Sequence, residues 1–488
     1  MSIVGETSET MAEKAAFQVI VLGPTGGPRE DSVTGILVRS TATKWSPNSV
    51  VAVDAGTLLA GIIRLLERYI PECTDDQGMM TSGPFQGLGL PCRTPQANAA
   101  HVFREIIGAV LITHPHLDHI SGLAINTPVL EAGNGPKPVA ALPSVLSALK
   151  NHMFNDVIWP NLSDEDGGPV CLHISAWWKV ETLASVVEIV EATHGRCKQR
   201  YHPETGTHHR VGSTVFSDHQ LMIPSRAISV DHTDGSFYSP ARSPHILPSN
   251  PKEPMMATVE SSAFFLRDHH TGTEIIVFGD VEPDCVSMGT HNKRVWEAAA
   301  PKIATGKLRA IFIECSYNDS TDDSYLYGHM CPRHLVFELS VLANRVLEIR
   351  DVSTGEKKRK RETVGPVESG SEQVSPKTKR ALSSCVDAGK ISESLIEPRS
   401  HPSGSFDIPR IPRVDFEEVL GHPDPQTWIH TTPLPLEGLK VYIIHIKENL
   451  TDGPHPGEQI LKELQHHGEA AHLGCEFFIP NPLEGIWI

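Results

Sequence analysis

The feature that most constrains this chain of 488 residues is the run HPHLDH at 114–119, which directly follows the apolar stretch GAVLIT at 108–113. Residues two apart on an extended backbone point to the same side, so His114 and His116 can bind one metal ion. A turn after them brings Asp118 and His119 to a second ion. Imidazole and carboxylate groups without thiolates suit zinc, manganese or ferrous iron. A solvent-facing polar loop is the alternative, but chance assembly of this pattern is improbable at this composition.

Two metal ions need further ligands, and three downstream residues are candidates. Asp280 ends the apolar run EIIVFGD, where its carboxylate can bridge two ions. His445 interrupts the apolar strand YIIHIK; a histidine there is more often a core residue, but the site requires a late ligand. His232 in SVDHTDG is the best intermediate candidate.

Strands and helices alternate through most of the chain, which favours a layered α/β domain. Apolar runs predict strands at 17–23, 35–38, 49–56, 274–280, 308–316 and 438–447, and helical periodicity predicts helices at 57–70, 292–303 and 332–349. The run GPTGGP after the first strand matches neither nucleotide-binding glycine pattern, so a tight turn is favoured there.

The domain organisation follows from composition. We expect a disordered tail at 1–15 and a single domain over 16–488. The segment 351–405 contains KKRKRETVGPVESGSEQVSPKTKR and little that is apolar, so it is predicted to be a disordered insertion within that domain. Its basic runs at 357–361 and 377–380 are either a nuclear localisation signal or part of a solvated linker.

Net charge and local composition limit the binding partners and the cellular location that can be expected. The net charge of −17 disfavours nucleic acid, whereas a small anionic substrate stays compatible because bound metal ions reverse the local potential. No run approaches the ~18 apolar residues of a membrane span, and no secretory signal is recognisable. A cytoplasmic location, or also a nuclear one, is therefore expected. The nine cysteines form no CxxC pair, which favours reduced thiols over disulfides.

Several further stretches give the chain a specific resemblance. HxHLDH alone identifies the metallo-β-lactamase superfamily. Together with FQVIVLGPTGGP, MFNDVIWPNL, SSAFFL, VFGDVEPD, IECSY, LYGHMCPRHLVFEL and VYIIHIK, it resembles the class II 3′,5′-cyclic-nucleotide phosphodiesterases of fungi and some bacteria. The resemblance spans nearly the whole chain apart from the tail and the insertion.

The resemblance implies a fold and a ligand set. The fold is a metallo-β-lactamase-like αβ/βα sandwich, an α/β architecture of two mixed sheets with outer helices. By motif, His114, His116 and His232 bind the first ion, Asp118, His119 and His445 bind the second, and Asp280 bridges the two. SVDHTDG departs from the family pattern, in which a small residue directly follows the histidine.

The implied reaction is hydrolysis of cyclic AMP, with cyclic GMP as an open alternative, to the nucleoside 5′-monophosphate. Two divalent ions, zinc or else manganese or iron, activate the attacking water. Asp118 and His329 are the expected catalytic residues. His329 resembles a family histidine that protonates the leaving group, and capping of the following helix is its alternative role. Asp54 is expected to orient a ligand histidine, or else to be a turn residue. A homodimer is left open.

Three other functions are alternatives for a chain with these motifs. A tRNA 3′-processing nuclease shares the ligand set, but the acidic balance and the lack of an evident RNA-clamping arm disfavour it. A thioester or lactone hydrolase leaves the downstream stretches unexplained. A non-catalytic scaffold usually has broken ligands, whereas every expected position here holds a competent residue.

Overall fold

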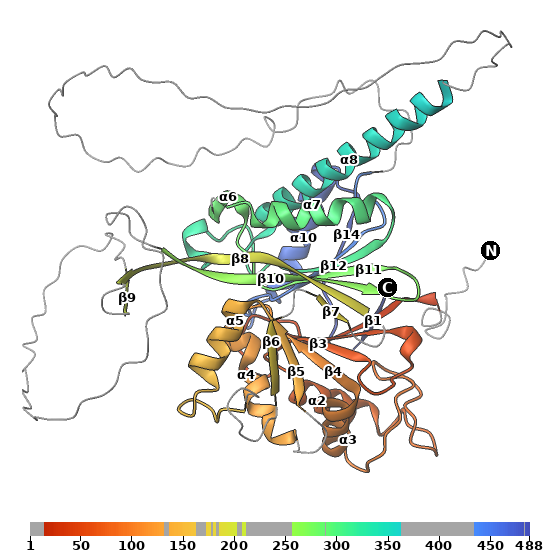
Figure 1. Ribbon diagram of the computed structural model, residues 1–488, viewed down its shortest axis with the longest axis vertical. Coiled ribbons are helices and arrows are strands. Elements are labelled where there is room, and N and C mark those ends of the chain that lie inside the picture. Colours follow the sequence, from red (N-terminus) through yellow and green to blue (C-terminus); the bar gives the residue numbers. More distant parts are fainter. Residues whose placement is uncertain are drawn as a thin grey trace, which may run out of the picture. The chain divides into compact units, whose positions relative to one another are not determined.

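Two mixed β-sheets pack face to face in the computed structural model, and helices cover the outer side of each sheet (Figure 1). The structure describes residues 14–130, 136–162, 172–176, 179–181, 185–202, 207–210, 256–287, 289–362, 434–482 and 484–488. The chain divides into two compact units, 1–353 with 434–488 and 354–433, and the two sheets belong to the first. The predicted αβ/βα sandwich is confirmed.

The first sheet has the strand order β15-β1-β2-β3-β4-β5-β6. Its strands are β1 (Phe17–Gly23), β2 (Gly35–Ser40), β3 (Val50–Ala55), β4 (Ile107–Leu111), β5 (Lys137–Ala141), β6 (Leu172–Ala176) and β15 (Gly485–Trp487). Strands β3 to β6 are parallel, so their carboxyl ends share one edge. The HPHLDH run leaves the sheet at that edge, after β4.

The second sheet has the order β14-β13-β12-β11-β10-β8-β7, and β9 pairs with β8. Its strands are β7 (Lys179–Glu181), β8 (Ser185–His202), β9 (Thr207–Arg210), β10 (Met256–Asp268), β11 (Glu274–Phe278), β12 (Leu308–Glu314), β13 (Lys440–Ile444) and β14 (Glu476–Phe478). Strands β11 to β14 are parallel. Three successive strand ends, those of β11, β12 and β13, therefore lie side by side.

Helices pack on both sheets (Figure 1). On the first sheet lie α2 (Leu59–Tyr69), α3 (Pro95–His101), α4 (Leu117–Asn126) and α5 (Pro143–Ala148). On the second lie α6 (Asp284–Ser287), α7 (His291–Ala304), α8 (Pro332–Glu362) and α10 (Pro456–Ala470). Short 3₁₀ helices span Thr41–Thr43, Thr127–Val129 and Asp323–Tyr325, and π-helical turns span Val102–Ile106 and Leu149–Met153. No described helix combines the length and the apolar character that a membrane span requires.

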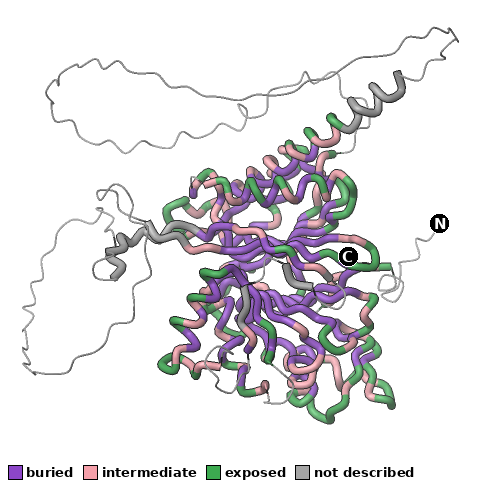
Figure 2. Tube along the Cα trace, viewed as in Figure 1, coloured by how far each residue is buried: buried purple, intermediate pink, exposed green. Residues whose placement is uncertain are grey.

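The central strands of the second sheet, β10 to β13, are buried on both faces (Figure 2). Along β10, Phe264 and Leu266 join the core between the sheets, whereas Ala263 and Phe265 join the core beneath α7, α8 and α10. Strands β11, β12 and β13 alternate in the same way. This double burial explains why these strands appear in the sequence as continuous apolar runs rather than as alternating patterns.

Some predicted segments lie wholly or partly outside the described residues. Residues 1–13 of the predicted tail are outside them, as is the basic run 377–380. Helix α8 continues to Glu362, so the start of the predicted insertion at 351–405 is helical, and the rest of that insertion lies outside the described residues.

Packing between the sheets gives a stability prediction at Phe312. Its side chain is fully buried, and its ring stacks on Tyr442 with 4.7 Å between centroids. Phe312→Ala leaves a cavity and should lower the free energy of unfolding by roughly 3–5 kcal/mol in urea denaturation. Leu450→Ala, at a position that is 65% exposed, should change it by less than about 0.5 kcal/mol. Equal losses in the two variants would contradict this packing.

Candidate metal centre

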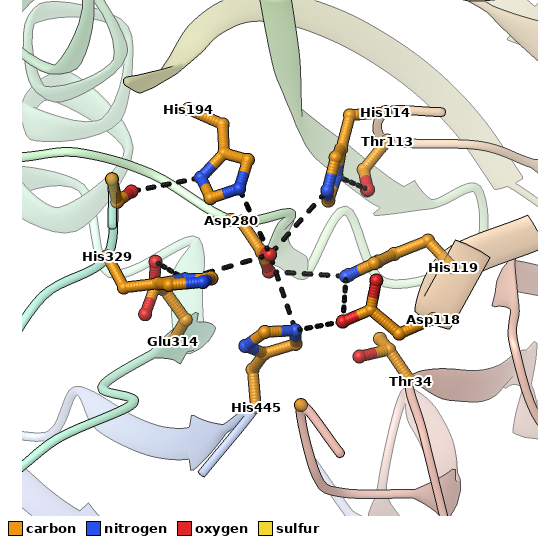
Figure 3. Close-up of polar contacts among 12 residues, drawn as sticks. Thr34, Thr113, His114, Asp118, His119, His194, Asp280, Glu314, His329 and His445 are labelled. Carbon is orange, nitrogen blue, oxygen red and sulfur yellow. Dashed lines mark hydrogen bonds and ion pairs between the residues drawn. The ribbon is translucent and has the colours of Figure 1, made fainter. Parts of the chain in front are cut away.

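Strand ends from both sheets bring histidine and acidic side chains together at one point (Figure 3). His114 and His116 follow β4, Asp118 and His119 begin α4, His194 lies in β8, Asp280 follows β11, Glu314 ends β12, His329 precedes α8, and His445 follows β13. Because carboxyl ends of parallel strands meet at one edge, residues far apart in the chain converge there.

A first group consists of His114, His116, His194 and Asp280, whose ligand atoms all lie within 4.8 Å of one another. The Nε2 atoms of His114 and His194 lie 3.5 Å and 3.7 Å from Asp280 Oδ2. Three imidazole nitrogens thus face one carboxylate oxygen.

A second group consists of Asp118, His119, His445 and again Asp280. His445 Nε2 lies 3.1 Å from Asp118 Oδ2 and 3.3 Å from Asp280 Oδ2, and His119 Nε2 lies 3.3 Å from Asp280 Oδ1. Asp280 belongs to both groups, which is the position expected of a bridging carboxylate.

The polar atoms at the middle of the two groups fit bound cations. Within the described part of the chain, the Nε2 atoms of His114 and His119 and both carboxylate oxygens of Asp280 are buried without a hydrogen-bond partner. Leaving a buried carboxylate unsatisfied is unfavourable. Nitrogen and oxygen donors are the ligands that zinc, manganese and ferrous iron accept. The residues present therefore fit two divalent ions that share Asp280.

Hydrogen bonds behind the centre orient three of the imidazoles. His119 Nδ1 lies 2.8 Å from Asp54 Oδ2, His114 Nδ1 lies 3.1 Å from Thr113 Oγ1, and His194 Nδ1 donates to the carbonyl of Gly328 at 2.9 Å. A proton held on Nδ1 leaves the lone pair of Nε2 directed toward the centre. The predicted contact between Asp54 and a histidine of the site is confirmed.

The buried carboxylate of Glu314 organises the other side. It accepts hydrogen bonds from His329 Nδ1 at 3.0 Å, from the backbone N–H of Val281 at 3.0 Å and from Ser316 Oγ at 2.7 Å. Ser316 Oγ in turn lies 3.1 Å from His445 Nδ1. Glu314 thus fixes His329, the backbone next to Asp280 and, through Ser316, His445. The side chain of His329 binds this carboxylate, not the start of α8.

Burial and charge set the protonation of the centre. Burial lowers the pKa of His194 to about 3 and holds the pKa of His114 well below its ordinary value, so both are neutral donors. Burial alone would raise the pKa of Asp280, but the charges of His445 and His119 hold it well below the usual range. Asp280 is therefore an ionised carboxylate.

The structure can be compared with the residues expected from the sequence. It brings together His114, His116, Asp118, His119, Asp280 and His445, and His329 lies beside them. His232 lies outside the described residues. His194 and Glu314 were missed. The sequence feature that could have indicated His194 is Gly195, because the family pattern places a small residue directly after a ligand histidine.

Comparisons with known proteins identify the family of this chain. The family model described as cAMP phosphodiesterases class-II matches residues 17–356. The 3′,5′-cyclic-nucleotide phosphodiesterase of Schizosaccharomyces pombe is 28% identical over 332 residues, which cover 68% of this chain and 76% of the relative. The Aliivibrio fischeri 3′,5′-cyclic-nucleotide phosphodiesterase is 25% identical over 331 residues, covering 68% and 77%.

Among solved structures, that of unliganded yeast PDE1 superposes with a TM-score of 0.60 at 20% identity, covering 97% of this chain and 100% of that chain. This likeness supports the fold. The family match extends over more than half of the sequence. The chain belongs to the class-II cAMP phosphodiesterases.

Proposed function

We propose that the protein hydrolyses the 3′,5′-cyclic phosphate of cyclic AMP, and of cyclic GMP by the same chemistry, to the nucleoside 5′-monophosphate at a centre with two divalent ions. The observation that carries this proposal is the buried Asp280 shared by two groups of ligands. Membership of the class-II cAMP phosphodiesterases supports the substrate.

Each group of side chains would hold one ion. His114, His116, His194 and Asp280 would hold the first, and Asp118, His119, His445 and Asp280 the second. Bound there, the ions would supply positive charge for the phosphoryl oxygens and lower the pKa of the attacking water. The nitrogen-rich ligand set supports zinc, with manganese or ferrous iron as alternatives.

His329 would donate the proton that the departing 3′ oxygen needs when its bond to phosphorus breaks. Glu314 holds Nδ1 of this imidazole, so Nε2 is the atom left for the substrate. Burial lowers the pKa of His329, but the charges of Glu314 and Asp280 outweigh burial and raise it. This upward shift of the pKa favours the protonated ring, the form that can act as a general acid.

The proposed partner is a small cyclic nucleotide. The net charge of −17 argues against nucleic acid. A cytoplasmic or nuclear location and a homodimer stay predictions from the sequence.

The metal requirement is tested with purified protein and both cyclic nucleotides. A chelator should abolish formation of the 5′-monophosphate, and added divalent ions should restore it. Asp118→Ala should cause near-complete loss, because it removes a ligand of the second group. Asp76→Ala, at an exposed position, is the matched control and should keep full activity. Hydrolysis that survives both the chelator and Asp118→Ala would refute the proposal.

Elemental analysis distinguishes the two candidate ligands of the first ion. His194→Ala should lose that ion and most of the activity, because His194 Nε2 faces Asp280 Oδ2. His232→Ala should keep both ions and its activity. The opposite pattern would indicate His232 as the ligand instead of His194.

The role of His329 is tested by changing the leaving group. His329→Gln should lower hydrolysis of cyclic AMP by about 10²–10⁴-fold. Hydrolysis of bis(p-nitrophenyl) phosphate should fall much less, because nitrophenolate departs without a proton. Metal content should match that of the wild type. Equal losses with the two substrates would exclude His329 as the acid.

A further inference from the structure

Lys447 extends a cationic group to the edge of the metal centre. It lies three residues beyond the end of β13, and its Nζ donates to the carbonyl of Gly26 at 2.6 Å and lies 3.7 Å from Asp118 Oδ2. The side chain is 25% exposed, so part of it can be reached by a ligand while its Nζ is held by the carbonyl of Gly26.

The GPTGGP loop at 23–28 fixes the position of this lysine. His445 N–H donates to the carbonyl of Pro24 at 2.7 Å, Gly26 N–H to that of Ile446 at 3.2 Å, and Glu448 N–H to that of Gly27 at 3.0 Å. The loop and the segment 445–448 thus form a short ladder that joins the two sheets beside the centre.

Gly26 is required at this close approach. A Cβ added to it would lie 2.4 Å from Cε1 of His445 and 2.7 Å from Nζ of Lys447. A side chain at this position would therefore displace both groups. The tight turn predicted from the sequence is thus also one wall of the centre.

The charges of the centre show what Lys447 can bind. Among the described residues, the carboxylates at the centre are those of Asp54, Asp118, Asp280 and Glu314. Among the described lysines and arginines, only Lys447 has a cationic nitrogen within 4.0 Å of one of these four carboxylates, that of Asp118. An ammonium carries three donors, and the carbonyl of Gly26 accepts one hydrogen bond from it. Since a phosphate oxygen is a strong acceptor for such a charged donor, the remaining donors suit the anionic substrate.

We propose that Lys447 is a substrate-binding residue whose ammonium donates to a non-bridging phosphate oxygen of the cyclic nucleotide and of its 5′-monophosphate product. This inference rests on the proposed function and names a phosphate contact within that site. The competing explanation is that Lys447 only balances the charge of Asp118 and so supports metal binding.

The test uses the full chain loaded with divalent ions. Lys447→Gln removes the charge, Lys447→Arg keeps it, and Lys462→Gln changes an exposed lysine of α10 as the matched control. For each variant, the experiment measures the metal content and the kcat and KM for cyclic AMP. It also measures the inhibition constants of 5′-AMP and of adenosine, which lacks the phosphate.

In Lys447→Gln, KM for cyclic AMP and the inhibition constant for 5′-AMP should each rise about tenfold or more. The inhibition constant for adenosine and the metal content should be unchanged. Lys447→Arg should recover most of the loss, and Lys462→Gln should match the wild type.

Three outcomes would overturn the inference: unchanged affinity for both phosphates, equal weakening of 5′-AMP and adenosine, or loss of metal that accounts for the whole effect. Failure of the proposed function is distinguishable, because the wild type would then hydrolyse neither cyclic nucleotide.

Discussion

The buried, ionised carboxylate of Asp280 is the constraint on which the arrangement of the centre depends. It is 1% exposed and makes no hydrogen bond to the described residues. Imidazole nitrogens of His114, His119 and His445 lie within 3.5 Å of its oxygens. A charge buried in this way is stable only among groups or ions of opposite sign. The strand ends of both sheets place imidazoles around this carboxylate, so the arrangement of the centre depends on the sandwich.

Hydrogen bonds on the outer side of the centre determine how its imidazoles point. Asp54 comes from β3, Glu314 from β12, and the carbonyl of Gly328 from the loop before α8. Because these partners belong to separate elements, no single loop determines the orientation of the site. The buried sheets hold the partners in position, which explains why rigid strands with apolar side chains carry so much of the chemistry.

Much of this could be predicted from the sequence, because the decisive patterns are local. HPHLDH after an apolar strand indicates metal ligands by spacing alone, and Asp280 and His445 stand out as polar residues at the ends of apolar runs. The remaining site residues depend on contacts over long distances in the chain. His194 lies within the long strand β8, where the alternation of side chains gives no sign that this histidine belongs to the site, whereas the histidine of SVDHTDG is more conspicuous in the sequence.

Glu314 and Gly26 illustrate the same limit. The sequence IECSY shows an acid at the end of a strand, but its hydrogen bonds to His329 and Val281 appear only when three strand ends are packed together. The GPTGGP run predicts a turn, and its approach to His445 depends on how the two sheets meet. Tertiary packing, which local patterns do not encode, creates these contacts.

The ladder between 24–27 and 445–448 joins the beginning of the fold to a segment more than four hundred residues later. The side chains at 114–119 and at 445 come together only after both ends of the sequence have folded onto each other. Free energy gained if ions bind at the centre would therefore add to the stability of the entire sandwich, since an unfolded chain lacks the assembled cluster. If the centre binds divalent ions as proposed, their supply would affect not only turnover but also how long the protein persists in its folded form.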